Sequence, residues 1–341
     1  MKKLFTSICI LFFSYLSHAA MGVTVINDAY NKAPITIFYP SSTPETPIQR
    51  AVFNIQGAWQ GMPMLGNKRL IVFSHGSGGS PWPMSDLARS LVDASFVVAM
   101  PEHEGDNFHD MHLQGPRTWK IRPQEISQTI DAIQHDPRFA SLIDFNQVGA
   151  YGSSAGGLTV LTLAGGQWSP ANFQRHCSIH MQQDFPACMG LIFTLHGDMW
   201  DNLKITVARI AHKLLFSDET LQSHHDPRIK AVIASMPMAA PLDMASLAKP
   251  RIAVGLIQAD LDAWLTPAFH IGAVRAVCTT CQTIADMSTA GHGSLLSPWP
   301  QELAQSITPM LVDPPNFDRA ELPVVYKRMA DFFSTQLLVG Q

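Results

Sequence analysis

Residues 147–157 read QVGAYGSSAGG and place Ser154 at the centre of a G-x-S-x-G pattern, which occurs once in the chain. The apolar residues before the serine indicate a short strand, and Leu158 and Leu161 after it indicate a helix. A serine at such a strand–turn–helix corner is typical of a nucleophile elbow, where a strained turn exposes the hydroxyl. The alternative is an ordinary turn between a strand and a helix.

The flanking glycines indicate which of two adjacent serines occupies the corner. Gly152 and Gly156 lie two residues before and two residues after Ser154. A β-carbon at either place would crowd the strand against the helix, and glycine removes it. Ser153 has Tyr151 at the first of these offsets and does not fit.

Composition limits the classes of partner. Only 15% of the 341 residues are charged and the net charge is −4, which argues against a nucleic-acid partner. The 24 prolines and 22 glycines suit a loop-rich enzyme, and the chain has no internal repeat. The oligomeric state is not predicted.

The N-terminus has the pattern of an export signal. Lys2 and Lys3 precede an apolar stretch, and Ser17-His18-Ala19 provides small residues at the cleavage positions. We expect residues 1–19 to be a signal peptide, removed on export to a bacterial periplasm or beyond, with an uncleaved anchor as the alternative. No later stretch is long and apolar enough to span a membrane.

The cysteines suit an oxidising compartment. One of the five, Cys9, lies in the leader, and the other four allow three pairings. We predict the local pairs Cys177–Cys188 and Cys278–Cys281. A redox role for the C-x-x-C spacing and a zinc site are weaker alternatives, because neither has the expected context.

Strands and helices alternate through most of the chain, which predicts an α/β fold: a mostly parallel central sheet with helices on both faces. Residues 167–228 show no clear buried strand, and we interpret them as an inserted lid within a single α/β domain of residues 20–341. A second independent domain is the alternative.

Residues 40–50 are expected to be a loop. The expected strands are 23–26, 35–39, 70–73, 96–100, 229–234, 252–257 and 281–285, and the expected helices include 84–92, 123–135, 205–215 and 326–338.

A serine nucleophile needs a base, and the base needs an acid to orient it. His292 follows the expected last strand with a glycine on each side, which leaves the imidazole free to reach over the sheet edge. Asp262 follows the strand 252–257 at its carboxyl end, where α/β sheets place functional groups. Asp260 is the alternative acid, and either aspartate could instead cap the following helix.

In the transition state of acyl transfer, the former carbonyl oxygen carries negative charge. Backbone N–H groups directed at this oxyanion stabilise it. We expect them from the backbone of Ala155, which follows the nucleophile, and of Ser77 in the glycine-rich turn 74–79. This turn lacks the spacing and the lysine of a phosphate-binding loop. His176 and His180 have the spacing of helical metal ligands, but no carboxylate partner can be placed from sequence, and no metal is assigned.

Several pieces of the chain, taken in order, resemble the α/β-hydrolases, in particular their dienelactone-hydrolase-like and platelet-activating-factor-acetylhydrolase-like branch. The resembling pieces are Ser74-His75-Gly76-Ser77-Gly78-Gly79, His103 with Gly105-Asp106-Asn107, Arg122-Pro123, residues 148–157, Asp226-Pro227-Arg228, Asp262 with Leu265, and Gly291-His292. The resemblance covers most of residues 22–300 except the insertion. It implies an α/β-hydrolase fold for residues 20–341, a Ser154–Asp262–His292 triad, no cofactor, and hydrolysis of carboxylic esters, with a small-molecule or lipid ester as the partner.

The resemblance has two limits. Authentic dienelactone hydrolases carry a cysteine at the elbow, so their substrate is not transferred to a chain with Ser154. In the platelet-activating-factor acetylhydrolase the acid of the triad follows an earlier strand, so the position of Asp262 rests on the bacterial relatives. The sequence therefore predicts an exported serine esterase, with a peptidase or amidase using the same triad, and a non-catalytic binding protein on the same fold, as alternatives.

Overall fold

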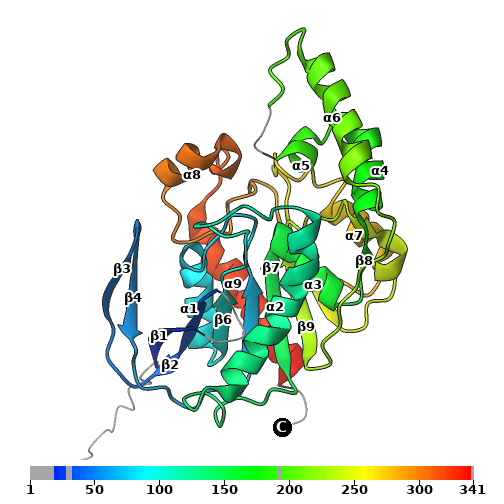
Figure 1. Ribbon diagram of the computed structural model, residues 1–341. Coiled ribbons are helices and arrows are strands. Elements are labelled where there is room, and N and C mark those ends of the chain that lie inside the picture. The colour runs from blue at the N-terminus through cyan, green and yellow to red at the C-terminus, as the bar shows by residue number, and fades with distance from the viewer. Residues whose placement is uncertain (1–18, 28–32, 191–193, 339–341) are drawn as a thin grey trace, which may run out of the picture.

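The structure is a computed structural model that describes residues 19–27, 33–190 and 194–338 (Figure 1). The predicted signal peptide lies outside this part of the chain except for its last residue. The first strand, β1 (Ala20–Ile26), begins at the residue where the mature chain is expected to start.

A ten-stranded sheet forms the centre of the molecule, in the order β12-β11-β9-β7-β5-β6-β2-β1-β4-β3. The strands from β12 to β6 run parallel to their neighbours, and β2 (Ile35–Ser41) joins them antiparallel. The sheet is therefore mostly parallel, and the predicted fold class is confirmed. The parallel strands are β5 (Leu70–Ser74), β6 (Val97–Pro101), β7 (Val148–Ser153), β9 (Ile229–Ser235), β11 (Ala253–Ala259) and β12 (Gln282–Met287).

The edge of the sheet differs from the sequence prediction. Residues 46–50, expected in a loop, form β3 (Thr46–Arg50), which pairs antiparallel with β4 (Phe53–Trp59). Ile48 and Ile55 face each other across this pair and are buried, while their neighbours in sequence are exposed. The loop prediction was wrong because one buried residue between Pro47 and polar neighbours gives too little alternation to detect.

Helices cover both faces of the sheet (Figure 1). α1 (Ser85–Asp93) and α9 (Leu322–Leu337) pack together on one face, and α2 (Pro116–His135) packs with α3 (Ala155–Leu163) on the other. α2 begins seven residues before the predicted helix, because Pro123 lies inside it rather than at its start. The remaining short helices outside the insertion are α7 (Ile271–Val277), α8 (Gln301–Ile307) and 3-10 turns at Trp82–Met84, Met244–Leu247, Pro309–Leu311 and Arg319–Glu321.

The segment between α3 and β9, which the sequence analysis interprets as an insertion, forms a helical lobe that rises from the main body, with one helix projecting outward (Figure 1). Its elements are β8 (Gln167–Trp168), which pairs with β10 (Leu242–Asp243), α4 (Pro170–His180), α5 (Phe185–Met189) and α6 (Asp201–Leu215). The hydrophobic core under α2 continues into it, since the ring of Trp119 lies 5.6 Å from Trp168 and 5.2 Å from Phe173.

Both predicted local disulfides form. Cys177–Cys188 joins α4 to α5 with a Cα–Cα distance of 5.7 Å, and Cys278–Cys281 follows α7 with 5.5 Å. Within the described ranges, the helices are too short or too polar to cross a membrane.

Candidate active site

Ser154 occupies a strained corner between β7 and α3. Its φ is 58° and its ψ is −120°, a conformation that residues with a side chain rarely adopt. A β-carbon on Gly152 would lie 2.0 Å from the carbonyl oxygen of Gly156, and one on Gly156 would lie 1.8 Å from the oxygen of Ser74. The two glycines therefore let the strand, the helix and the neighbouring strand approach closely enough to form the turn.

Two side chains from distant parts of the sequence form a hydrogen-bonded series with the Ser154 hydroxyl. His292, in the loop after β12, places its Nε2 3.0 Å from Ser154 Oγ. Its Nδ1 lies 2.7 Å from Oδ2 of Asp262, in the loop after β11. Ser154 is partly exposed, whereas His292 and Asp262 are buried.

The loop after β11 places Asp262, rather than Asp260, beside the imidazole. The second carboxylate oxygen of Asp262, Oδ1, accepts hydrogen bonds from the backbone N–H groups of Trp264 (2.9 Å) and Leu265 (2.8 Å). Asp262 thus orients the histidine with one oxygen and caps its own turn with the other. Asp260 is exposed and accepts a hydrogen bond from Gln258.

A hydroxyl, an imidazole and a carboxylate in series can perform nucleophilic chemistry. A carboxylate on Nδ1 keeps the proton there, so Nε2 presents a lone pair to the serine hydroxyl. The imidazole can then accept the serine proton during attack and return it to a leaving group. The three residue types are therefore arranged for acyl transfer.

The glycine-rich turn after β5 lies directly against the corner. A β-carbon on Gly76 would lie 3.3 Å from Cβ of Ser154. Two donors of the turn bind Oδ1 of the buried Asp106: the Ser77 hydroxyl at 2.6 Å and the Gly78 N–H at 3.0 Å. Arg122 of α2, fully buried, binds Asp106 Oδ2 at 2.7 Å. This ion pair fixes the shape of the turn beside Ser154.

The electrostatics of this ion pair favour the ionised carboxylate. Burial acts to raise the pKa of Asp106, but the Arg122 guanidinium and the hydrogen bonds from Ser77 and Gly78 outweigh it, so the pKa lies below its usual value. Arg122 also donates to the carbonyl oxygen of His75 at 2.6 Å. The sequence analysis named Asp106 and Arg122 only as parts of the resemblance, because no spacing rule links residues that are 16 positions apart.

The backbone N–H groups of Ser77 and Ala155 are the predicted oxyanion donors. Throughout the part of the chain that the structure describes, neither donates a hydrogen bond to another protein group. Ala155 begins α3, where the helix dipole favours negative charge. Both groups are therefore available to an added oxygen.

A second serine–histidine–carboxylate series lies underneath this turn. His103, just after β6, places Nε2 2.7 Å from Ser74 Oγ and Nδ1 2.6 Å from Oε2 of Glu125 on α2. Ser74 and His103 are completely buried. Burial, followed by the nearby Arg122 charge, holds the pKa of His103 well below its usual value. This series therefore contains a neutral imidazole with no route for a substrate.

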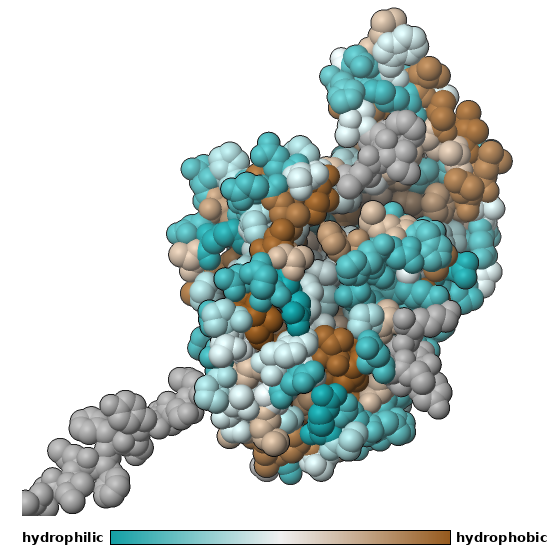
Figure 2. Space-filling view, turned by 60° about the vertical axis from the view of Figure 1, so that its left-hand side comes forward, coloured by the Kyte–Doolittle hydropathy of each residue, from teal (hydrophilic) through white to brown (hydrophobic). Residues whose placement is uncertain are grey.

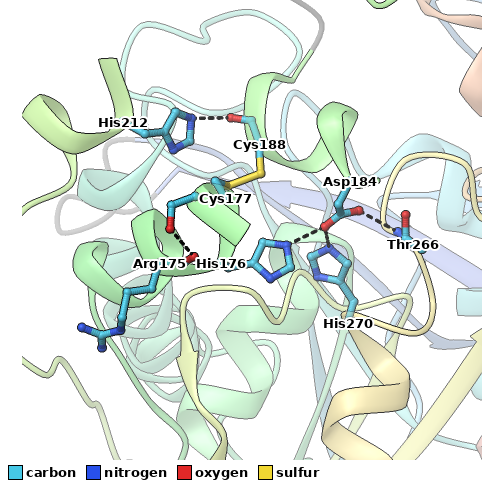
Figure 3. The surroundings of a disulfide bond; sticks show 9 residues. Arg175, His176, Cys177, Asp184, Cys188, His212, Thr266 and His270 are labelled. Atoms are coloured by element: carbon cyan, nitrogen blue, oxygen red, sulfur yellow. Dashed lines mark hydrogen bonds and ion pairs between the residues drawn. A yellow bond between two sulfur atoms is a disulfide. The ribbon is translucent and has the colours of Figure 1, made fainter. Parts of the chain in front are cut away.

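A third cluster joins the insertion to the main body (Figure 3). Oδ2 of Asp184 lies 2.7 Å from Nε2 of His176 and 2.9 Å from Nε2 of His270, and its Oδ1 accepts the N–H of Thr266 at 3.2 Å. Asp184 supplies the carboxylate partner for His176 that sequence analysis could not place. Thr266 is four residues after Asp262, so the insertion braces the loop that carries this aspartate.

The residues of this cluster are of types that bind metals, but one of them, His270, has no lone pair free for a metal. The ligand atoms of His176, Asp184 and His270 lie within 4.8 Å of one another. However, the Ala239 N–H donates to Nδ1 of His270 at 3.0 Å, so the ring proton is on Nε2 and points to Asp184. With both ring nitrogens engaged, His270 has no lone pair for a metal, and the cluster fits a hydrogen-bonded brace.

Comparison with known proteins supports the fold. No protein-family model matches the chain, and no curated protein matches it in sequence. Among solved structures, the chain is similar to a ferulic acid esterase from Streptomyces cinnamoneus, with a TM-score of 0.59 and 16% identity over 95% of this chain and 92% of that chain. At this identity the likeness establishes the architecture, an α/β-hydrolase fold, and not the reaction.

Proposed function

We propose that the protein is a serine hydrolase that cleaves carboxylic esters through an acyl-enzyme. The observation that carries the proposal is the hydrogen-bonded series Ser154–His292–Asp262 at a strained, partly exposed corner. Ser154 Oγ attacks the ester carbonyl while His292 Nε2 takes its proton. The imidazolium then protonates the departing alcohol, and Asp262 stabilises the charge on the ring.

Water completes the cycle in the same geometry. His292 removes a proton from a water molecule, the hydroxide attacks the acyl carbon, and the proton returns to Ser154 Oγ as the carboxylic acid leaves. We assign the oxyanion to the N–H groups of Ser77 and Ala155, each worth about 3–4 kcal/mol of transition-state stabilisation. Asp106 and Arg122 would hold the first of these donors in place.

The likeness to a ferulic acid esterase supports an ester as the substrate class. The narrower assignment, to the dienelactone-hydrolase-like and acetylhydrolase-like branch, rests on the sequence motifs. The two disulfides support a place in an oxidising compartment, the periplasm or the outside of the cell, as the N-terminal leader suggests.

Replacement of the proposed nucleophile tests the function. We expect Ser154→Ala to reduce turnover of p-nitrophenyl acetate and butyrate by about 10⁴-fold or more while the melting temperature is kept. Ser153→Ala is the matched control, because the neighbouring serine is buried and not hydrogen-bonded to His292, and it should retain most of the activity.

The same assay decides between the alternatives. Unchanged turnover in Ser154→Ala would reject the assignment. Faster turnover of a p-nitroanilide than of the matched ester would indicate an amidase. A wild-type protein that hydrolyses neither would indicate a binding protein.

A further inference from the structure

Helix α6 carries an apolar stripe on the side that faces away from the protein. Leu203, Val207, Ile210 and Leu214 follow one another at intervals of three or four residues and therefore lie along one face of the helix. Between 54% and 75% of each of these side chains is exposed. Leu215, Met199 and Trp200 extend the apolar surface beyond the stripe at both ends, and they are also exposed. We call these seven residues the α6 patch.

The orientation of α6 is fixed by its other face. Ile205, Ala208 and His212 are buried, and Nε2 of His212 lies 2.9 Å from the carbonyl oxygen of Cys188, beside the disulfide that joins α4 to α5 (Figure 3). The helix therefore cannot turn its apolar side inward without losing this contact. Figure 2 shows hydrophobic residues gathered along the outer edge of the projecting lobe.

An exposed apolar surface of this kind indicates a binding partner. Scattered apolar side chains on a surface are ordinary, but a continuous row along one helix marks an interaction site. Throughout residues 19–27, 33–190 and 194–338, nothing covers the α6 patch, because each of its side chains is more than half exposed.

The charges next to the patch indicate the chemistry of that partner. Arg209 and Lys213 are exposed, lie one turn apart, and make no ion pair with another described residue. Lys213 adjoins Ile210, three residues earlier. By contrast, the cation at the other end, Lys204, is paired with Asp201 at 2.9 Å. An apolar helix face with a tryptophan at its end and unpaired cations along its side is the pattern of a helix that lies in a lipid–water interface.

We propose that the α6 patch docks the protein on an anionic lipid surface. The apolar side chains enter the boundary between headgroups and acyl chains, and Arg209 and Lys213 meet the phosphate groups. The docking surface does not depend on the proposed chemistry.

Vesicle co-sedimentation of the purified protein tests the proposal. We expect binding to vesicles of phosphatidylcholine with phosphatidylglycerol, and weaker binding to phosphatidylcholine alone. The double variant Ile210→Gln with Leu214→Gln should lower the partition coefficient by about tenfold or more, since it removes apolar area that enters the lipid. Arg209→Gln with Lys213→Gln should lower binding to the anionic vesicles by about fivefold for each charge and leave binding to neutral vesicles unchanged.

A matched control separates the patch from general hydrophobicity. Val52→Gln with Val324→Gln removes two apolar side chains that are equally exposed, 56% each, but lie outside the patch. This variant should bind like the wild type, and all variants should keep the wild-type melting temperature. Ser154→Ala should also bind like the wild type, so failure of the chemistry and failure of docking are distinguishable.

Three outcomes would overturn the proposal. The first is wild-type protein that stays in the supernatant with both kinds of vesicle. The second is equal binding by the wild type and the Ile210→Gln, Leu214→Gln variant. The third is a wild-type dimer that this variant converts to a monomer, with no lipid binding, which would make the α6 patch a contact between two copies of the chain.

Discussion

Two serine–histidine–carboxylate series lie side by side in this molecule, and their distances are almost the same. In Ser154–His292–Asp262 the two hydrogen bonds are 3.0 and 2.7 Å long, and in the buried series of Ser74, His103 and Glu125 they are 2.7 and 2.6 Å. The pattern of hydrogen bonds therefore does not distinguish the two series, whereas their surroundings do.

The difference lies in backbone conformation and access. Ser154 lies at a positive φ on a turn and is partly exposed, with the free N–H of Ala155 next in sequence. Ser74 is the last residue of a buried strand and has no exposed surface. A substrate can therefore reach only the first hydroxyl. We interpret the second series as a support that ties β5, β6 and α2 together under the turn that carries Ser77.

Neutralising the carboxylate of each series should give the largest contrast. Asp262→Asn should lower kcat by about 10³–10⁴-fold, because the amide no longer holds the imidazole in the tautomer that accepts the serine proton. Glu125→Gln should lower kcat by less than about tenfold, while the free energy of unfolding falls by about 1–3 kcal/mol through the weakened, partly buried hydrogen bond to His103.

The measurements are kcat on p-nitrophenyl butyrate and chemical unfolding of both variants. Correcting each rate for the folded fraction separates chemistry from stability. An equal loss of kcat per folded molecule in the two variants would contradict the division of roles.

A smaller effect concerns pH. Burial comes first among the causes that hold the pKa values of His75 and His103 well below the ordinary value near 6.5. Below pH 6.5 the unfolded chain binds protons that the folded chain does not, so the free energy of unfolding falls as the pH drops. Each histidine that stays neutral in the folded chain at pH 5.5 should contribute about 1.4 kcal/mol of loss between pH 7.5 and 5.5.

Denaturant titrations at these two pH values measure this loss, and His103→Gln should make it smaller by up to about 1.4 kcal/mol. The same decrease in the wild type and in the variant would show that His103 does not titrate in the way its burial requires.

Sequence patterns were most informative where local chemistry is demanding. Only glycine tolerates the close approaches at Gly152 and Gly156, so the glycine spacing, together with the apolar residues on both sides of it, locates the turn in the sequence. Parallel strands bring their carboxyl ends to one edge, which is why Asp262 and His292 could be named as neighbours of Ser154. The local disulfides followed from short spacing.

Other features depend on contacts that no local pattern encodes. The hairpin of β3 and β4 has too weak an alternation of apolar residues to be recognised. The ion pair of Asp106 with Arg122 and the brace around Asp184 each join segments whose proximity follows only from the packed tertiary structure. The apolar side of α6 is readable as a periodic pattern, but the pattern does not say which face is buried.

Fluorophosphonate labelling with peptide mapping tests the central claim most directly, because the reagent reacts with an activated serine. Trypsin separates Ser154, in residues 139–175, from Ser74, in residues 70–89. The account predicts one adduct per chain, on Ser154, which is absent from the Ser154→Ala variant. No adduct, or an adduct on Ser74 or Ser153, would contradict it.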